Sequence, residues 1–382
     1  MSPRDPQGVT GHAAMPFVAR GIGDELGPDK VVLLREPRVG LEAVVVIDNV
    51  ACGPAIGGVR MAPDVTVEEV SRLARAMTLK NAAAGLAHGG GKSGIAADPA
   101  APPADKERLI RAFARAIRSL TEYIPGPDMG TDERCMAWIK DEIDRAVGLP
   151  RVLGGIPLDE IGATGWGVAI AAEIAAPEAG IALAGARVAI EGFGAVGQHA
   201  ARFLAARGCR MVAASDSRGA IHDPAGLPID ALIAHKRAGR PLTDFPGGRA
   251  IGRDALIGVP CEIWIPAARP DTITADNVSG LQAKLVIQGA NIPATEPAER
   301  WMHAHRILSV PDFIANAGGV ICAAIEYHGG SQAQAFATIE ERIRANTRET
   351  LDGVRTDGIV PREAATRMAL ARVREAMRYR RP

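Results

Sequence analysis

The spacing of apolar and polar residues predicts strands followed by helices in the first part of the chain. In the second part it predicts strands and helices that alternate regularly. In the first part, residues 31–35 and 41–48 are apolar runs of strand length, and a third strand is expected at residues 58–61. Helical spacing begins after Thr66. Glu69 follows three residues later, which is the arrangement of a capping box at a helix start.

The pattern then predicts two more helices, one after a proline-rich break near residue 102 and one from Thr131. Residues 148–160 are rich in Gly and Pro and indicate a connection between domains. Beyond them, strands and helices alternate, and the chain is helical from about Ala333 to its end. This order predicts an α/β fold of two domains, the second built on a parallel sheet covered on both faces.

Composition narrows the class of protein. The 382 residues carry 44 basic and 44 acidic side chains, so the formal net charge is zero. A protein that binds nucleic acid or a membrane surface would carry an excess of basic residues, and this chain has none. No secretory signal or membrane-spanning run is visible, and the five cysteines are scattered. We therefore expect a cytoplasmic protein with reduced thiols and no metal site.

The segment "AAAGLAHGGGKSGIAADP" at residues 82–99 has three glycines before Lys92. A phosphate-binding P-loop would need a glycine at position 86, where this chain has Leu86, so that interpretation fails on spacing. Only seven of the basic residues are lysines, and Lys80 and Lys92 lie close in sequence. Lysine can lose its proton and act as a base, whereas arginine cannot. The alternative is a pair of solvated lysines on a helix and its loop.

A dinucleotide site is predicted where Gly192, Gly194 and Gly197 form G-x-G-x-x-G between an apolar strand and a helix. The helix start, including Ala195 and Val196, offers backbone N–H groups to a pyrophosphate. Asp216 and Ser217 end the next strand, where a carboxylate accepts hydrogen bonds from the ribose. The alternative is a glycine turn that binds no ligand.

The same strand end bears on the choice between NAD and NADP. The carboxylate of Asp216 would repel a 2′-phosphate, which favours NAD. Arg218 lies two residues later and could pair with that phosphate, so NADP stays possible.

Six motifs carry a family resemblance. In chain order they are "GPAIGGVRM" (53–61), "AMTLKNAAAGLAHGGGKSGI" (76–95), "PGPDMGTDE" (125–133), "EGFGAVG" (191–197), "QGAN" (288–291) and "NAGGV" (316–320). With these motifs the chain resembles the glutamate/leucine/phenylalanine/valine dehydrogenase superfamily. The resemblance implies a substrate domain at residues 1–150, completed by C-terminal helices at 345–382, and a Rossmann domain at 151–344. The active site would lie in the cleft between them.

The resemblance implies the roles of three charged residues in oxidative deamination of an amino acid to a 2-oxo acid and ammonia. Lys92 would be the catalytic lysine, with the glycines before it forming a turn close to the substrate. Lys80 would hold the substrate α-carboxylate as a fixed cation. Asp128 would take part in proton transfer; on spacing alone it could instead cap the helix that begins near Thr131.

Other matched positions are implied to surround the reacting atoms. Thr164 and Asn291 would contact the nicotinamide half of the cofactor, and Asn316 would lie near the reacting centre. The remaining residues expected at the substrate are Gly57, Gly58, Met77, Ile56 and Ala323.

Two of these positions bear on which amino acid is used. Glutamate-specific members carry a lysine where this chain has Ile56, and a hydroxyl residue where it has Ala323. Burying the second carboxylate of glutamate without them is costly. We therefore expect an apolar L-amino acid resembling leucine, valine or phenylalanine. The alternatives are a glutamate dehydrogenase with an atypical pocket and a catalytically silent sensor of NAD or an amino acid. The resemblance also implies a homo-oligomer, a hexamer or an octamer.

Overall fold

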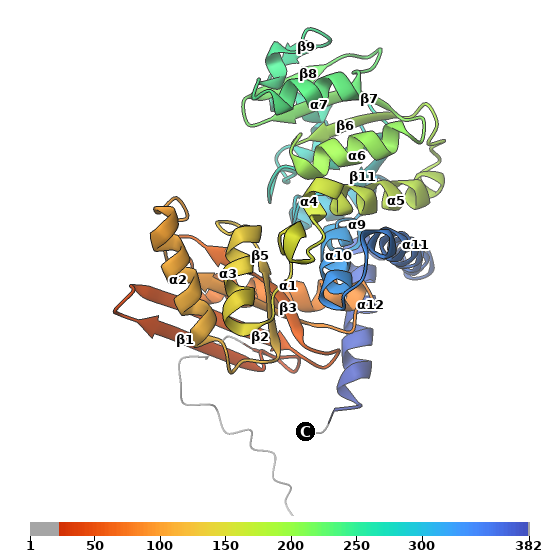
Figure 1. The fold of residues 1–382 in the computed structure, drawn as a ribbon. Helices are drawn as coiled ribbons and strands as arrows, with labels where there is room; N and C mark the ends of the chain where they lie inside the picture. The colour runs from red at the N-terminus through yellow and green to blue at the C-terminus, as the bar shows by residue number, and fades with distance from the viewer. Residues whose placement is uncertain (1–22, 381–382) are drawn as a thin grey trace, which may run out of the picture.

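The computed structural model describes residues 23–380, which form two lobes, each built around its own β-sheet (Figure 1). The first sheet has the order β1-β2-β4-β3-β5, with β3 parallel to β4 and β5 and with β2 antiparallel to β1 and β4. Its strands are β1 (Lys30–Glu36), β2 (Leu41–Asn49), β3 (Ala55–Met61), β4 (Gly89–Ile95) and β5 (Tyr123–Pro127). The three strands expected in the first part of the chain are thereby confirmed.

Helices cover both faces of this sheet: α1 (Val67–Ala83) on one, α2 (Pro103–Ala116) and α3 (Glu133–Ile143) on the other. Side chains alternate along a strand, so successive residues of β2 serve different cores. Val44 and Val46 pack with α1. Val45 and Ile47 pack in the cluster that contains α2 and α3.

The three glycines before Lys92 lie in β4, not in the turn that the resemblance implies. A Cβ on Gly90 would lie 2.0 Å from the backbone nitrogen of Thr78 in α1. A Cβ on Gly89 would lie 1.9 Å from the carbonyl oxygen of Asn49 in β2. The glycines thus allow the helix and a neighbouring strand to approach the backbone of β4.

The second sheet has the order β12-β11-β10-β6-β7-β8-β9. Its strands are β6 (Arg187–Glu191), β7 (Arg210–Asp216), β8 (Gly219–His222), β9 (Arg249–Ile251), β10 (Ile263–Pro266), β11 (Leu285–Ile287) and β12 (Leu308–Val310). The expected parallel sheet accounts for five strands, whereas β8 and β9 pair antiparallel at one edge. Two residues join β7 to β8, which is enough for a hairpin and too short for a parallel crossover.

Helices cover both faces of the second sheet, as expected. The helices between residues 158 and 327 are α4 (Leu158–Ile161), α5 (Ala163–Glu178), α6 (Ala195–Ala205), α7 (Ile229–Arg237), α8 (Glu296–Ala304), α9 (Asp312–Ala315) and α10 (Gly318–Tyr327). Short 3₁₀ turns are η1 (Arg151–Leu153), η2 (Leu242–Asp244), η3 (Leu256–Gly258) and η4 (Val278–Gly280).

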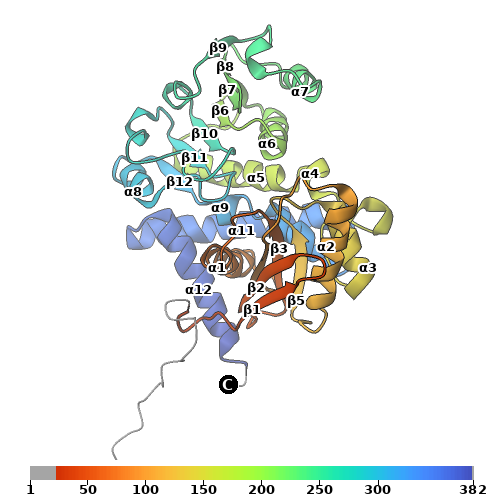
Figure 2. The same cartoon turned by 90° about the vertical axis from the view of Figure 1, so that its left-hand side faces the viewer.

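The last two helices connect the lobes. The long helix α11 (Gln332–Asp357) packs on α5, and α12 (Pro361–Met377) returns to pack on α1 (Figure 2). The predicted boundary at residue 345 falls inside α11, and the division of the chain at that residue and at 150 stays a prediction. Among the helices of residues 23–380, none combines the length and apolarity needed to cross a membrane.

Candidate active site

Three neighbouring strands of the first sheet bring a lysine, an aspartate and an arginine together. Lys92 lies in β4, Asp128 directly follows β5, and Arg60 lies in β3 between them. The Nζ atom of Lys92 is 3.0 Å from Oδ1 of Asp128. The Nε atom of Arg60 donates to Oδ2 of the same carboxylate over 2.9 Å. Both oxygens of Asp128 are therefore bound by cations.

Asp128 does not cap the following helix, so that alternative interpretation is wrong. The N-cap of α3 is Asp132, whose side chain accepts from the backbone nitrogen of Cys135. Thr131 instead fixes the loop: its hydroxyl accepts from the backbone nitrogen of Asp128 and donates to the carbonyl of Val59. The carboxylate of Asp128 is thus left to face Lys92 and Arg60.

Arg60 is a site residue that our sequence analysis missed, although it lies inside the quoted motif "GGVRM". Its guanidinium also pairs with Glu69 at the start of α1. The expected capping box is consequently only half formed. Thr66 accepts from the backbone nitrogen of Glu69, while the Glu69 carboxylate pairs with Arg60.

Burial and neighbouring charges set the proton affinities of this group. Lys92 is 6% exposed, and burial lowers the pKa of its ammonium more than the charge of Asp128 raises it. For Asp128, burial acts to raise the pKa. The charges of Lys92 and Arg60 outweigh it and hold the pKa of this carboxyl below its ordinary value. The site therefore favours an ionised Asp128 beside a lysine that gives up its proton more readily than usual.

Two glycines of β3 leave space for this charged group. A Cβ on Gly58 would lie 2.7 Å from Cβ of Asp128 and 3.1 Å from Nζ of Lys92. A Cβ on Gly57 would lie 1.6 Å from the carbonyl oxygen of Gly91 in β4. Side chains at these positions would displace the groups that the sequence predicts to act on the substrate.

Lys80 joins the two lobes. It lies in the last turn of α1, one turn after Met77, and its Nζ is 3.5 Å from Oδ1 of Asn291 in the second lobe. Burial lowers the pKa of Lys80 to about 8, with a further lowering from the charge of Lys92. Lys80 is therefore mostly charged at neutral pH and loses its charge at alkaline pH, and a bound carboxylate would raise that pKa again.

Asn316 contacts the same oxygen of Asn291 as Lys80 does. It is buried, and its Nδ2 donates to the carbonyl of Ala290 and to Oδ1 of Asn291. Its own Oδ1 is buried and finds no hydrogen-bond partner within residues 23–380. Thr164 lies beside Gly319, three residues after Asn316: a Cβ built on Gly319 would come within 3.1 Å of the hydroxyl oxygen of Thr164. The buried Oδ1 of Asn316 is therefore available to accept from a donor on a bound ligand or from water.

Ile56 and Ala323 come together, as the sequence analysis expects of two residues lining one pocket. Both are buried, and they share an apolar cluster at the meeting of β3 and α10. The other members are Ile124, Val147, Ala324 and Leu86.

The glycine turn between β6 and α6 fits a dinucleotide. Gly192 has φ +93°, and a Cβ there would meet the backbone of Ala268 at 2.6 Å. A Cβ on Gly197 would meet the carbonyl oxygen of Gly192 at 2.1 Å. Gly194, the N-cap of α6, borders open space and offers no side-chain cap. The first N–H groups of α6, from Ala195 and Val196 onward, are thus available to a pyrophosphate.

A cavity of about 430 Å³ lies in front of this turn. It is lined by residues 191–194, 215–217 and 267–269 together with Lys236 and Arg253. Asp216 and Ser217 border it as predicted, and Lys236 is a further residue that our sequence analysis missed. Arg218 does not line this cavity, and its guanidinium donates to the carbonyl of Gly239.

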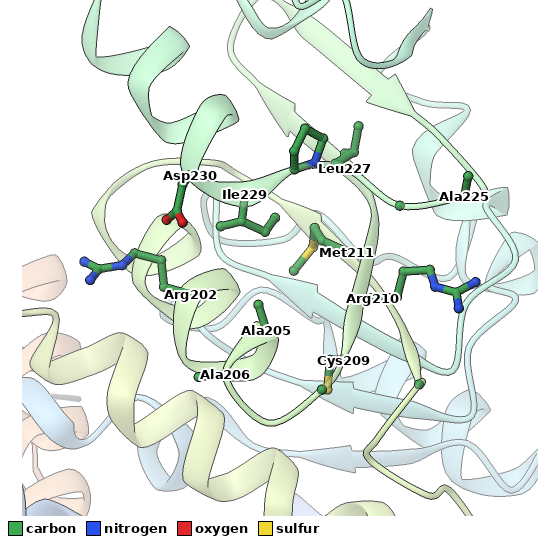
Figure 3. Close-up of a pocket in the computed structure, with 14 residues that line it drawn as sticks. Arg202, Ala205, Ala206, Cys209, Arg210, Met211, Ala225, Leu227, Ile229 and Asp230 are labelled. Carbon is green, nitrogen blue, oxygen red and sulfur yellow. The ribbon is translucent and has the colours of Figure 1, made fainter.

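A larger hollow of about 680 Å³ lies elsewhere on the second lobe (Figure 3). It is bordered by the end of α6 and the start of β7, with Arg202 and Asp230 on one side and Arg210 on the other. Dinucleotides bind outside the carboxyl ends of parallel strands, and this hollow lies at the amino end of β7. It is therefore not the cofactor site.

Comparison with known proteins agrees with the geometry. Residues 29–145 match the family model for the Glu/Leu/Phe/Val dehydrogenase dimerisation domain, and residues 154–381 match the Glutamate/Leucine/Phenylalanine/Valine dehydrogenase model. A glutamate dehydrogenase of Aeropyrum pernix is 36% identical, covering 87% of this chain and 85% of its own. An NAD-specific glutamate dehydrogenase of Staphylococcus aureus is 37% identical, covering 87% and 84%.

A solved structure extends the likeness to the fold. The hetero-hexameric glutamate dehydrogenase from Thermus thermophilus, in its Leu-bound form, superposes with a TM-score of 0.82. The match covers 93% of this chain and 91% of that one, at 30% sequence identity. The chain therefore belongs to the glutamate/leucine/phenylalanine/valine dehydrogenase family, and it is an NAD(P)-dependent amino-acid dehydrogenase.

Proposed function

We propose that the substrate is L-glutamate, which is oxidatively deaminated to 2-oxoglutarate and ammonia, with reductive amination as the reverse reaction. The support is the identity of 36–37% over most of the chain with proteins named glutamate dehydrogenase. This favours the alternative of our sequence analysis over the expected preference for apolar substrates.

In this proposal the charged residues of the first lobe carry the proton chemistry. Lys80 binds the α-carboxylate, which raises the lowered pKa of this lysine and keeps it charged to higher pH. Lys92, with its lowered pKa, takes a proton from the water that attacks the oxidised α-carbon. Asp128 passes protons to and from the departing amine, and its contact of 3.0 Å with Lys92 lets the two groups exchange them.

The second lobe aligns the reacting partners. The turn at Gly192 and the start of α6 would hold the pyrophosphate, and Thr164 and Asn291 would face the nicotinamide half. The bound cofactor supplies the hydride acceptor. Asn291 contacts both Lys80 and Asn316. It can therefore align the substrate carboxylate held by Lys80 with the second lobe, where the cofactor binds.

One observation favours a second candidate, an apolar L-amino acid. Ile56 and Ala323 lie in an apolar cluster where a cation and a hydroxyl would be needed to pair a second carboxylate. Leucine, valine or phenylalanine would bury its side chain there without an unpaired charge.

A substrate panel tests the proposal. Purified protein would be assayed for NADH and NADPH formation with glutamate, leucine, valine and phenylalanine at alkaline pH. Glutamate ahead in kcat/KM supports the proposal, and an apolar amino acid ahead replaces it with the second candidate. A protein that reduces neither cofactor with any of the four amino acids would contradict both candidates.

We also propose that the chain forms a homo-oligomer, as expected from its sequence. The match of residues 29–145 to a dimerisation domain supports this. Within residues 23–380, β1 is an edge strand, and it exposes Leu33 (68%) and Val31 (38%); such apolar side chains on an edge strand suit an interface. Light scattering after gel filtration measures the assembly, and a monomer would contradict the proposal.

A further inference from the structure

We propose that Asp312 is a positioning residue for the reaction: it fixes the turn that presents Asn291 to Lys80, and its carboxylate stabilises the ammonium of that lysine. The inference rests on the proposed role of Lys80 at the substrate α-carboxylate and deepens it. Asp312 lies outside the six motifs quoted from the sequence, four residues before Asn316.

The backbone at Ile292 is the first observation. Its φ of +47° lies in the left-handed region, which a β-branched residue rarely adopts. Such a conformation persists where the surrounding contacts impose it. The backbone nitrogen of Ile292 donates to Oδ2 of Asp312 over 3.0 Å, and its carbonyl accepts from the backbone nitrogen of Asp271 over 3.0 Å. The side chain of Asp312 therefore helps to hold this turn in its strained form.

The turn governs where Asn291 points, because Asn291 directly precedes Ile292. Oδ1 of Asn291 is 3.5 Å from Nζ of Lys80 and accepts from Nδ2 of Asn316 over 3.1 Å. Asp312 also binds the main chain of Asn316, since its carbonyl accepts from the nitrogen of Asn316 over 2.7 Å. One residue thus fixes the backbone at Asn316 and beside Asn291.

Arg362 holds the carboxylate of Asp312 in place. Its guanidinium reaches from α12 and donates to Oδ1 of Asp312 over 2.8 Å, which leaves Oδ2 for Ile292. The same guanidinium donates to Glu299 over 2.7 Å and to Gln288 over 2.9 Å. Asp312 is only 5% exposed, so these contacts, and not solvent, set the orientation of its side chain.

The charge of Asp312 acts on Lys80 where α9 packs against α1. Burial lowers the pKa of Lys80, and the negative charges of Asp312 and Asp128 oppose that lowering. The positive charge of Lys92 adds to it. Without Asp312, Lys80 would lose its proton at lower pH and would hold a carboxylate over a narrower pH range.

Chemical labelling measures the effect on Lys80 without any substrate. Wild-type protein, Asp312→Asn and Asp312→Ser would be exposed to a trace of acetic anhydride from neutral to alkaline pH, with acetylation of each lysine followed by mass spectrometry. The reagent attacks the neutral amine, so the midpoint of the rate against pH reports the pKa of Lys80. We expect this midpoint to fall by about one unit in both variants, the size of shift that a nearby charge produces. Asp276→Asn removes an exposed aspartate of the same lobe and should leave the midpoint unchanged.

Turnover at neutral pH measures the positioning of Asn291. Neither replacement at Asp312 can accept from both Arg362 and Ile292 as the carboxylate does, so kcat should fall about tenfold or more as the turn loosens. Adding Ile292→Gly to Asp312→Asn should recover part of that loss, because glycine adopts a positive φ without strain. The added glycine should leave the midpoint of Lys80 lowered, which separates the turn from the charge.

The possible failures can be told apart. Once circular dichroism shows a folded variant, an unchanged midpoint of Lys80 would overturn the proposal. Wild-type kcat in that variant, or a kcat loss that Ile292→Gly does not relieve, would also overturn it. A lowered midpoint together with glutarate inhibition that is independent of pH in the wild type would leave the link between Asp312 and Lys80 standing. That result would contradict the proposed binding of the substrate carboxylate by Lys80.

Discussion

The ammonium of Lys92 lies 3.0 Å from a carboxylate oxygen of Asp128, and Arg60 binds the other oxygen of that carboxylate. A buried lysine beside a single carboxylate would form a closed ion pair. The additional cation shares the negative charge of Asp128, so Lys92 is held less tightly in its protonated form. The geometry therefore joins a lysine that can lose its proton to a carboxylate that stays ionised.

Replacing Lys92 tests its proposed role as the base. We expect Lys92→Ala to lower kcat by about 10²- to 10⁴-fold, the usual contribution of a general base. Binding of NADH, followed by fluorescence, should be unchanged. Lys140→Ala removes a lysine on the surface of α3 and serves as the control. A Lys92→Ala variant that keeps more than about a tenth of wild-type kcat, a loss below about 1.4 kcal/mol in activation free energy, would contradict the role.

Arg60 should set the acid limb of the pH profile. It lowers the pKa of Asp128, so the carboxylate stays ionised to lower pH in the wild type. Removing the guanidinium raises that pKa, and Arg60→Gln should therefore lose activity at a higher pH as the solution is acidified. Arg60→Lys should return the limb towards its wild-type position. The measurement is kcat/KM against pH, and an unshifted acid limb in Arg60→Gln would show that Arg60 has no influence on Asp128.

Deprotonation of Lys80 should weaken substrate binding at alkaline pH. Its pKa of about 8 means that the free protein loses this charge as the pH rises through 8. The inhibition constant of glutarate, a dicarboxylate that cannot react, should accordingly increase above that pH. Lys80→Arg keeps its charge, so its inhibition constant should stay flat through the same range. If both proteins follow the same curve, the alkaline loss comes from another group.

Gly58 should tolerate no side chain. A Cβ there would lie 2.7 Å from Cβ of Asp128, so Gly58→Ala must move the carboxylate away from Lys92. Displacements of this size cost about 10²-fold in rate. Gly258→Ala is the matched control, since the nearest atom to its Cβ would be 4.0 Å away. Circular dichroism would confirm that both variants fold. Near-wild-type kcat in Gly58→Ala would show that Asp128 can shift without consequence.

The elements of the fold could be predicted from sequence because their periodicity is local. The expected strands, the helix after Thr66 and the glycine turn at Gly192 all form where the pattern places them. The strand β4 was hidden, since "GGGKSGI" lacks the alternation of a strand and has a single β-branched residue, Ile95. Its glycines reflect the close approach of α1, which is a tertiary contact that local spacing does not encode.

Some residues of the candidate site could also be predicted from local sequence, and others could not. Lys80, Lys92 and Asp128 were predicted through motifs, and they come together in space. Arg60 and Lys236 were missed because their roles depend on partners in other elements, Asp128 and Asp216. Arginine is abundant in this chain, so its residue type gave no signal. Lys236 is one of seven lysines, and that rarity was the one available indication.

The pair of Ile56 and Ala323 should control the balance between glutamate and apolar amino acids. Ile56→Lys with Ala323→Ser supplies a cation and a hydroxyl in the apolar cluster, and a charge-assisted contact there is worth about 10- to 100-fold. The ratio of kcat/KM for glutamate to that for leucine should rise accordingly. Without ligand the variant should lose about 1–3 kcal/mol of unfolding free energy, because the lysine is buried without a partner. Glutarate should restore part of its Tm. Ile56→Met with Ala323→Ser lacks the cation and should leave the ratio within a few-fold; an equal rise in both variants would exclude charge as the cause.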